Sequence, residues 1–144
     1  NTEGFVEEAD AQDRGLHEIV IMASLIEKEG RTPEERRMIA GIIQNRLKAG
    51  MRLQLDSTLN YLTGSGRARS SLQDLEIVSP YNTYKNAGLP PGPICNPGKD
   101  SLEAALNPKA SNYYFYLHDD QGKIYYARNL EEHKINRYQA YGAE

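Results

Sequence analysis

The segment from Ser79 to Ile94 most constrains how this chain can fold, because prolines and glycines interrupt it at short intervals. Pro80 opens it, and a run from Gly88 to Pro93 consists mostly of glycine and proline. Each proline fixes its own φ and pushes the preceding residue toward extended geometry, so the segment cannot form regular helix. Apolar and aromatic residues within it favour a packed, shaped loop over a linker, and long ordered loops are often functional.

Two amphipathic helices are predicted before this loop. The first runs from about Leu16 to Glu29, and Gly30 ends it. The second begins at Thr32 as the N-cap, with Glu35 as its capping-box partner, and Gly50 closes it. Shorter elements are expected to follow, namely an extended stretch over 51–56, a short helix over 58–62 and a helical turn over 71–75.

The part after the loop predicts a short helix, a β-hairpin and a last helix. Asp100 or Ser101 is expected to cap the short helix, which ends at Leu106. The hairpin strands are expected over 113–117 and 123–127, and Asn129 starts the last helix. Because no βαβ alternation is present, the order favours an α+β fold, with N-terminal helices, a small antiparallel sheet and a C-terminal helix.

The length of 144 residues suits one domain. Residues 16–144 are assigned to that domain, and the acidic residues 1–15 to a truncated connection with an upstream region. The net charge of −3 argues against a nucleic-acid partner. The longest apolar run, 19–26, is too short to cross a bilayer. One cysteine and three scattered histidines lack metal-ligand spacing, so neither a metal nor a cofactor is expected.

Glu27 is the candidate catalytic residue, because a helical wheel places it inside the apolar face of the first helix. It falls between Leu16 and Val20, whereas Glu18 and Glu29 lie on another side and are expected to be solvated. Burial would raise the pKa of the Glu27 carboxyl above about 4.3, toward the roughly 6–7 that suits a general acid near neutral pH. The alternative is a structural glutamate that pairs with an arginine of the second helix.

The other candidate reactive residues of the sequence favour chemistry on carbohydrates. No Ser/His/Asp set and no phosphate-binding loop is visible. Cys95 with His118 or His133 leaves a Cys/His dyad open, although a small packed cysteine is the plainer interpretation. The ten tyrosines suit sugar or peptide ligands, or half-buried positions in a sheet.

The stretch from Met22 to Glu29 resembles the catalytic helix of the MltG/YceG-like endolytic peptidoglycan transglycosylases. Further segments resemble the same family in the same order, namely 45–47, 50–58, 81–84, 88–94, 96–98 and 113–138. The resemblance covers about residues 16–141 and rests on several ordered motifs rather than one.

This resemblance implies non-hydrolytic cleavage of glycan strands at the β-1,4 bond between N-acetylmuramic acid and N-acetylglucosamine, giving 1,6-anhydro-muramic acid ends. Glu27 would protonate the leaving oxygen and then take the proton of the attacking C6 hydroxyl. Asp56 is expected nearest to it. The candidate substrate-binding residues are Gln54, Asp56, Thr58, Tyr61, Tyr81, Asn82, Thr83 and Tyr84.

The resemblance also implies a LysM-like region and a membrane anchor upstream, a place on the extracytoplasmic face of the bacterial inner membrane or in the periplasm, and peptidoglycan synthases as partners. Three alternatives stay open at this point. One is a lysozyme-like muramidase that uses Glu27, Asp56 and water. Another is a non-catalytic peptidoglycan-binding or scaffolding module of the elongation or division machinery, and the last is a cysteine-dependent enzyme.

Overall fold

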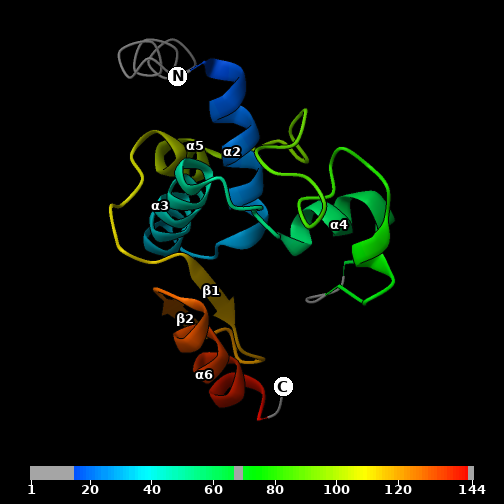
Figure 1. Ribbon diagram of the computed structural model, residues 1–144. Coiled ribbons are helices and arrows are strands. Elements are labelled where there is room, and N and C mark those ends of the chain that lie inside the picture. Colours follow the sequence, from blue (N-terminus) through cyan, green and yellow to red (C-terminus); the bar gives the residue numbers. More distant parts are fainter. Residues whose placement is uncertain (1–14, 67–69, 143–144) are drawn as a thin grey trace.

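The computed structural model describes residues 15–66 and 70–142 of the chain (Figure 1). Its elements follow in the order α2 (Leu16–Glu29), α3 (Pro33–Ala49), α4 (Asp56–Thr63), the 3₁₀ turn η1 (Asp74–Glu76), α5 (Lys99–Leu106), β1 (Phe115–His118), β2 (Ile124–Ala127) and α6 (Leu130–Tyr141). The predicted α+β class, with helices first, then a hairpin and a last helix, is confirmed.

The hydrophobic core forms around α2, which packs against α5 and α3 (Figure 1). Ile19, Leu25 and Ile26 of α2 meet Ile39 and Ile43 of α3 in one buried cluster. Each such side chain contributes about 1.5–3 kcal/mol when it leaves water, so this cluster fixes the position of α2. The side chains at the end of α2 therefore stand on a fixed support.

The ends of α3 follow the predicted signals. The Thr32 side chain accepts a hydrogen bond from the Glu35 amide at 3.1 Å, and the Glu35 carboxylate accepts one from the Arg31 amide at 3.2 Å. Gly50 ends the helix with a φ of 72°, the left-handed conformation that glycine adopts without steric cost. The N-cap and C-cap predictions for this helix are confirmed.

A close backbone approach ties α3 to the segment that leads into the hairpin. Gly41 faces the chain at Lys109, where a Cβ atom would lie 2.0 Å from the Lys109 carbonyl oxygen. The Lys109 amide donates to the Arg37 carbonyl at 3.0 Å. The Asn45 side chain donates to the carbonyls of Ser111 and Tyr113. These contacts hold residues 109–113 along α3 and so set where the hairpin begins.

The hairpin and α6 form the other part of the molecule (Figure 1). Strands β1 and β2 are antiparallel, with Tyr116 opposite Tyr126 and His118 opposite Ile124. The turn is closed by the Asp119 side chain, which accepts from the amides of Gln121 and Lys123. Both strands are shorter than predicted, since each has four residues.

The proline-rich loop is packed, as predicted. The Asn82 amide group donates to the carbonyls of Leu75 and Ile77, and its oxygen accepts from the Tyr84 amide. The Ile94 amide donates to the Ser24 hydroxyl of α2 at 3.1 Å. The loop is therefore fixed to the helical core by internal polar contacts.

Some boundaries differ from the prediction. Helix α5 begins at Lys99 with Gly98 as its N-cap, instead of a cap at Asp100 or Ser101, because the Ser101 hydroxyl is used elsewhere. The predicted turn over 71–75 is a 3₁₀ turn displaced to η1. The predicted connection over 1–15 lies outside the described residues except for Gly15. Over the described ranges, no helix has the length and apolar character that a membrane crossing requires.

Candidate functional site

The carboxylate of Glu27 sits at the start of α5 and is held by three donors. Its Oε1 atom accepts from the Gly98 amide at 2.9 Å and from the Ser101 hydroxyl at 2.8 Å. Its Oε2 atom lies 3.4 Å from Nη2 of Arg36 on α3. The side chain is 29% exposed. Glu27 therefore links α2, α3 and α5.

These contacts make the expected rise of the Glu27 pKa wrong for this structure. The Gly98 amide and the Ser101 hydroxyl each lower the pKa of Glu27 by more than burial raises it, and the charges of Arg36 and Lys28 lower it further. The physical reason is the place of Glu27 on the wheel. Its neighbour Leu16 is 38% exposed, so this edge of the apolar face does not enter the core. The arginine pairing from the second helix, left open by the sequence, is present.

Glu29 was expected to be solvated, and this expectation is wrong. Its Oε1 atom accepts from the Tyr116 hydroxyl at 2.5 Å, and its Oε2 atom accepts from the Ser57 amide at 3.1 Å. Ser57 belongs to the first turn of α4, whose N-cap residue Leu55 supplies no side-chain hydrogen bond. Glu29 therefore satisfies a free amide at the start of α4, where the helix dipole also favours a negative charge.

Further polar groups surround Glu29. The Tyr84 hydroxyl donates to Asp56 Oδ1 at 2.6 Å. Burial raises the pKa of both Tyr84 and Tyr116, and the nearby carboxylates of Asp56 and Glu29 raise the two pKa values further. Both phenols therefore stay protonated and donate hydrogen bonds. We call the set the Glu29 cluster; its members are Glu29, Asp56, Tyr84, Tyr116 and Arg46.

Arg46 is the cation of the Glu29 cluster and is itself buried. Its guanidinium donates to the carbonyls of Tyr114 and Arg52, each at 2.6 Å. Burial lowers the pKa of Arg46, while the charge it carries lowers the pKa values of Tyr84 and Tyr116. Arg46 thus adds positive charge near the two phenols that bind the carboxylates of Glu29 and Asp56. The arrangement suits chemistry in which a carboxyl group gives or takes a proton.

Gln54 has an unusual backbone next to this cluster. Its φ of 53° makes it the one non-glycine residue with a positive φ among those the structure describes. Its amide donates to the Thr83 carbonyl at 3.1 Å, and its side chain is exposed. A left-handed conformation at a residue other than glycine costs free energy and occurs often at functional sites. Gln54 thus remains a candidate for ligand contact, two residues before Asp56.

The other predicted substrate residues divide into two groups. The side chains of Thr58, Asn82 and Thr83 are fully buried and form internal hydrogen bonds, such as the 3.0 Å contact between the two threonine hydroxyls. In this conformation they brace the loops and lie out of reach of a ligand in solvent. Tyr61 and Tyr81 form a tilted ring pair with centroids 5.2 Å apart, and Tyr61 is 48% exposed, which suits packing on a sugar face.

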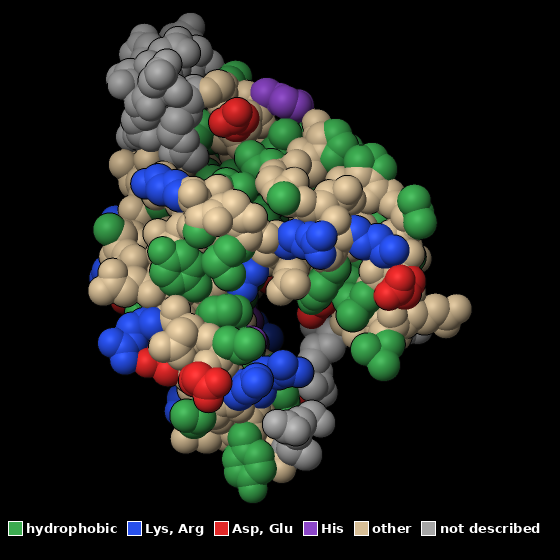
Figure 2. All heavy atoms as spheres, viewed as in Figure 1, with side chains coloured by type: hydrophobic (Ala, Val, Ile, Leu, Met, Phe, Trp, Pro, Cys, Tyr) green, Lys and Arg blue, Asp and Glu red, His purple; other side chains and the backbone are tan. Residues whose placement is uncertain are grey.

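The space-filling view shows the surface hollowed between the part that holds β1, β2 and α6 and the part that holds α4 (Figure 2). The Glu29 cluster joins these two parts, because Tyr116 belongs to β1 and Asp56 to α4. Among the described residues, no group of histidine, cysteine, aspartate or glutamate side chains is arranged to hold a metal ion.

With this geometry in place, comparison with known proteins identifies the family. The sequence profile of the YceG-like family matches residues 1–139. The chain belongs to the YceG-like family. It is 47% identical over 118 residues to an endolytic murein transglycosylase of Bacillus subtilis (strain 168), covering 82% of this chain and 33% of that protein. It is 42% identical over 127 residues to the endolytic murein transglycosylase of Streptococcus pneumoniae serotype 2, covering 84% and 23%.

A solved structure supports the fold of this YceG-like chain. It superposes with a TM-score of 0.89 on a yceG-like protein from Listeria monocytogenes, at 44% identity, covering 94% of this chain and 45% of that one. The chain spans about a third or less of the length of the curated relatives that it matches.

The sequence of this YceG-like chain did not predict a role in the site for Glu29, Tyr116, Arg46 or Ser101. A helical wheel sorts residues by face, and it carries no information about what meets the end of a helix. Glu29 is the last residue of α2 and lies before Gly30, so the chain turns there and brings α4 and β1 to its side chain. The position before a helix-ending glycine was the one available signal.

Proposed function

We propose that this chain carries the catalytic site of a peptidoglycan lytic transglycosylase that cleaves within glycan strands. Membership of the YceG-like family and relatives named endolytic murein transglycosylase support the activity. The observation that carries the proposal is a carboxyl group at the end of the core helix, which is bonded to the neutral Tyr116 phenol of β1 and to the Ser57 amide of α4, so that it joins the two parts of the molecule.

The proposed reaction breaks the β-1,4 bond between N-acetylmuramic acid and N-acetylglucosamine without water. The carboxyl group donates its proton to the leaving glycosidic oxygen, which departs as the 4-hydroxyl of N-acetylglucosamine. The C6 hydroxyl of the same muramic acid forms the new bond to the anomeric carbon, and its proton returns to the carboxylate. One carboxyl group suffices, because the nucleophile is part of the substrate and is held at high effective concentration.

The identity of this carboxyl group is open to two assignments. The sequence predicted Glu27, but its three donors stabilise the charged form and make it a poor acid. Neither Asp56 nor Tyr84 contacts Glu27 among the described residues, whereas both belong to the Glu29 cluster, with Gln54 close by in the sequence. We therefore propose Glu29 as the acid and base, and Glu27 as the residue that fixes α5 against α2.

Two matched variants decide between the assignments. Glu29→Gln and Glu27→Gln each keep the size of the side chain and remove its titration. Purified peptidoglycan is digested by the full-length protein, and anhydro-muropeptides are counted by mass spectrometry. We expect Glu29→Gln to lower the product by at least about a hundredfold, the range for loss of a general acid, and Glu27→Gln by less than about tenfold. The reverse order would restore Glu27 as the acid.

The same digestion separates the alternative activities. A muramidase would use a second carboxylate to engage water and would leave reducing ends. Asp56 lies in the Glu29 cluster, but the Tyr84 hydroxyl occupies one of its oxygens. A non-catalytic binding or scaffolding module would leave the glycan intact with every variant. Anhydro ends from the wild-type protein would exclude both.

The cysteine-dependent alternative lacks its histidine in the structure. The Cys95 thiol lies against the Ser24 carbonyl at 3.3 Å, and burial raises the pKa of the thiol. His118 lies 3.1 Å from Glu35, and His133 stacks on Phe115. Within the described residues no Cys/His dyad is formed, so Cys95→Ser should leave cleavage unchanged.

We also propose that the site works on the extracytoplasmic face of the bacterial cell membrane or in the periplasm, since its substrate lies there. A LysM-like region, a membrane anchor and peptidoglycan synthases as partners complete the proposal, and they rest on the family resemblance alone.

A further inference from the structure

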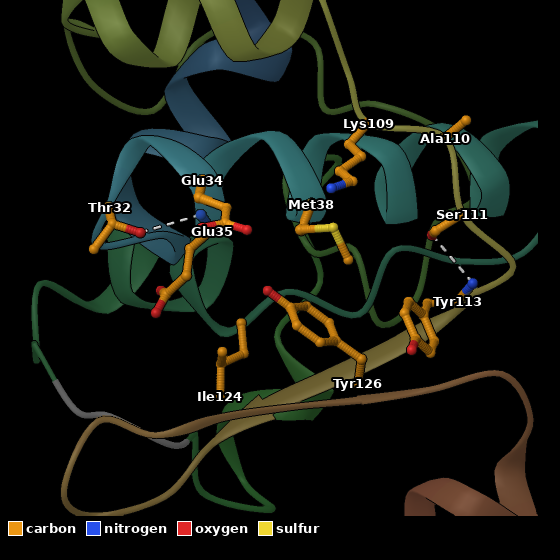
Figure 3. Close-up of a pocket in the computed structure, with 10 residues that line it drawn as sticks. All are labelled: Thr32, Glu34, Glu35, Met38, Lys109, Ala110, Ser111, Tyr113, Ile124 and Tyr126. Atoms are coloured by element: carbon orange, nitrogen blue, oxygen red, sulfur yellow. Dashed lines mark hydrogen bonds between the residues drawn. The ribbon is translucent and has the colours of Figure 1, made fainter.

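A pocket of about 570 Å³ lies between α3 and the inner face of the hairpin, away from the contacts of Glu29 (Figure 3). Glu34, Glu35 and Met38 line it from α3, Lys109 and Tyr113 line it from the segment between α5 and β1, and Tyr126 lines it from β2. Figure 3 shows the Met38 side chain pointing toward the Tyr126 ring, and the Lys109 amine beside Met38. The pocket thus combines an aromatic wall, an apolar side chain and charges of both signs.

Of the charged side chains that line this pocket, one is already paired and two are not. The Glu35 carboxylate already lies 3.1 Å from His118 Nε2 and accepts from the Arg31 amide. The side chains of Glu34 and Lys109 form neither an ion pair nor a hydrogen bond within the described part of the chain, and they do not pair with each other. An acid and a base in one concave surface, both free, fit a ligand that carries an amine and a carboxylate.

The aromatic wall of the pocket also favours a ligand with a cationic group. The rings of Tyr113 and Tyr126 are stacked, with centroids 5.3 Å apart. Burial and the charges of Glu35 and Glu34 raise the pKa of Tyr126 to about 12. The negative potential of the two glutamates therefore reaches the Tyr126 ring. A cationic group near that ring would be attracted by the ring face and by the glutamates.

The pocket and the Glu29 cluster are adjacent, because each includes one member of an opposed pair of hairpin residues. Tyr126 lies directly opposite Tyr116, whose hydroxyl donates to Glu29. Opposed residues of an antiparallel pair share one face of the sheet, with Cβ atoms roughly 5 Å apart. In peptidoglycan each muramic acid carries a short peptide on its lactyl group, and three extended residues span about 10 Å. A peptide on a saccharide bound at Glu29 can therefore reach this pocket.

We propose that the pocket between α3 and the hairpin binds the stem peptide of peptidoglycan, with Glu34 facing the cationic side-chain amine and Lys109 facing a carboxylate. The proposal rests on the proposed function, because the peptide comes with the glycan strand. It makes the enzyme selective for strands that still carry their peptides.

A binding experiment tests the pocket without any cleavage. The probe is the free tripeptide L-alanyl-γ-D-glutamyl-L-lysine, titrated into the 144-residue chain and followed by the amide NMR signals. We expect a Kd of roughly 1 mM, with shifts confined to residues around the pocket. Glu34→Gln and Lys109→Met should each weaken binding about threefold to fivefold, the size of one partly exposed charge contact. Glu131→Gln and Lys48→Met are the matched controls on exposed positions elsewhere and should bind as the wild type does.

The modified probes assign the two charges. A tripeptide acetylated on the lysine side chain should bind the wild type more weakly, and Glu34→Gln should not change its affinity further. A tripeptide with amidated carboxyl groups should bind the wild type and Lys109→Met with equal affinity. Absence of binding at millimolar peptide, shifts outside the pocket, or equal binding by the pocket variants and their controls would each overturn the proposal. Failure of the proposed function is a separate result, since it shows as absence of glycan cleavage whether or not the peptide binds.

Discussion

Glu27 and Glu29 lie two residues apart on α2, yet their carboxylates serve different neighbours. The donors around Glu27 are a backbone amide, a hydroxyl and a guanidinium. Those around Glu29 are a phenol and the first turn of α4. The first set stabilises the charged form of Glu27, whereas the second includes the neutral Tyr116 phenol. Position on the same helix therefore does not imply the same chemistry.

Glu27 should give the stability of the protein a pH dependence at the acidic side. Its pKa is lowered in the folded state, so its contribution is present above the unfolded value of 4.5 and is lost as pH falls through the lower folded value. Glu27→Gln should cost about 1 kcal/mol at pH 7 and less at pH 3. Urea unfolding followed by circular dichroism measures both values. An equal cost at the two pH values would show that the carboxylate is not held as described.

At the scale of elements, the contact of α3 with residues 109–113 depends on the absence of a side chain at Gly41. A Cβ atom there would lie 2.0 Å from the Lys109 carbonyl, so Gly41→Ala must separate the two backbones. We expect a loss of about 1–3 kcal/mol, the typical cost of overpacking, and a lower Tm. Gly15→Ala is the matched control, because a Cβ atom at that position meets nothing within 4 Å. A similar Tm for both variants would contradict the close approach.

The sequence predicted the helices and hairpin because their signals are local. Thr32 and Gly50 mark the ends of α3, and the turn residues 119–122 between two strand-like stretches mark the hairpin. The site depended on contacts between distant segments, such as Glu29 with Tyr116 and Asp56 with Tyr84, which no local pattern encodes. Thr58, Asn82 and Thr83 illustrate the same limit, since polar side chains in a loop motif can face inward as well as outward.

The whole molecule consists of a helical part with the core and a smaller part formed by β1, β2 and α6. The core cluster draws most of its buried residues from α2, α3 and α5, and the others, Leu53, Leu55 and Ile94, from loops, whereas α6 has no buried residue. Leu117 and Ala127 are the buried apolar residues of the two strands. The smaller part therefore has less apolar area to resist opening.

Amide hydrogen exchange should reveal this difference. Amides in the middle of α2 should exchange only on global unfolding, and amides of β1, β2 and α6 should exchange faster, by about tenfold or more. Mass spectrometry of peptic fragments from the exchanged chain provides the rates. Uniform protection across both parts would show that the hairpin and α6 share the stability of the core.

The left-handed backbone at Gln54 has a consequence for how this position can vary in evolution. Only glycine and a few short polar residues adopt that conformation easily, and β-branched residues are almost barred from it. Backbone geometry therefore limits which residues can occupy position 54, independently of any contact with a saccharide.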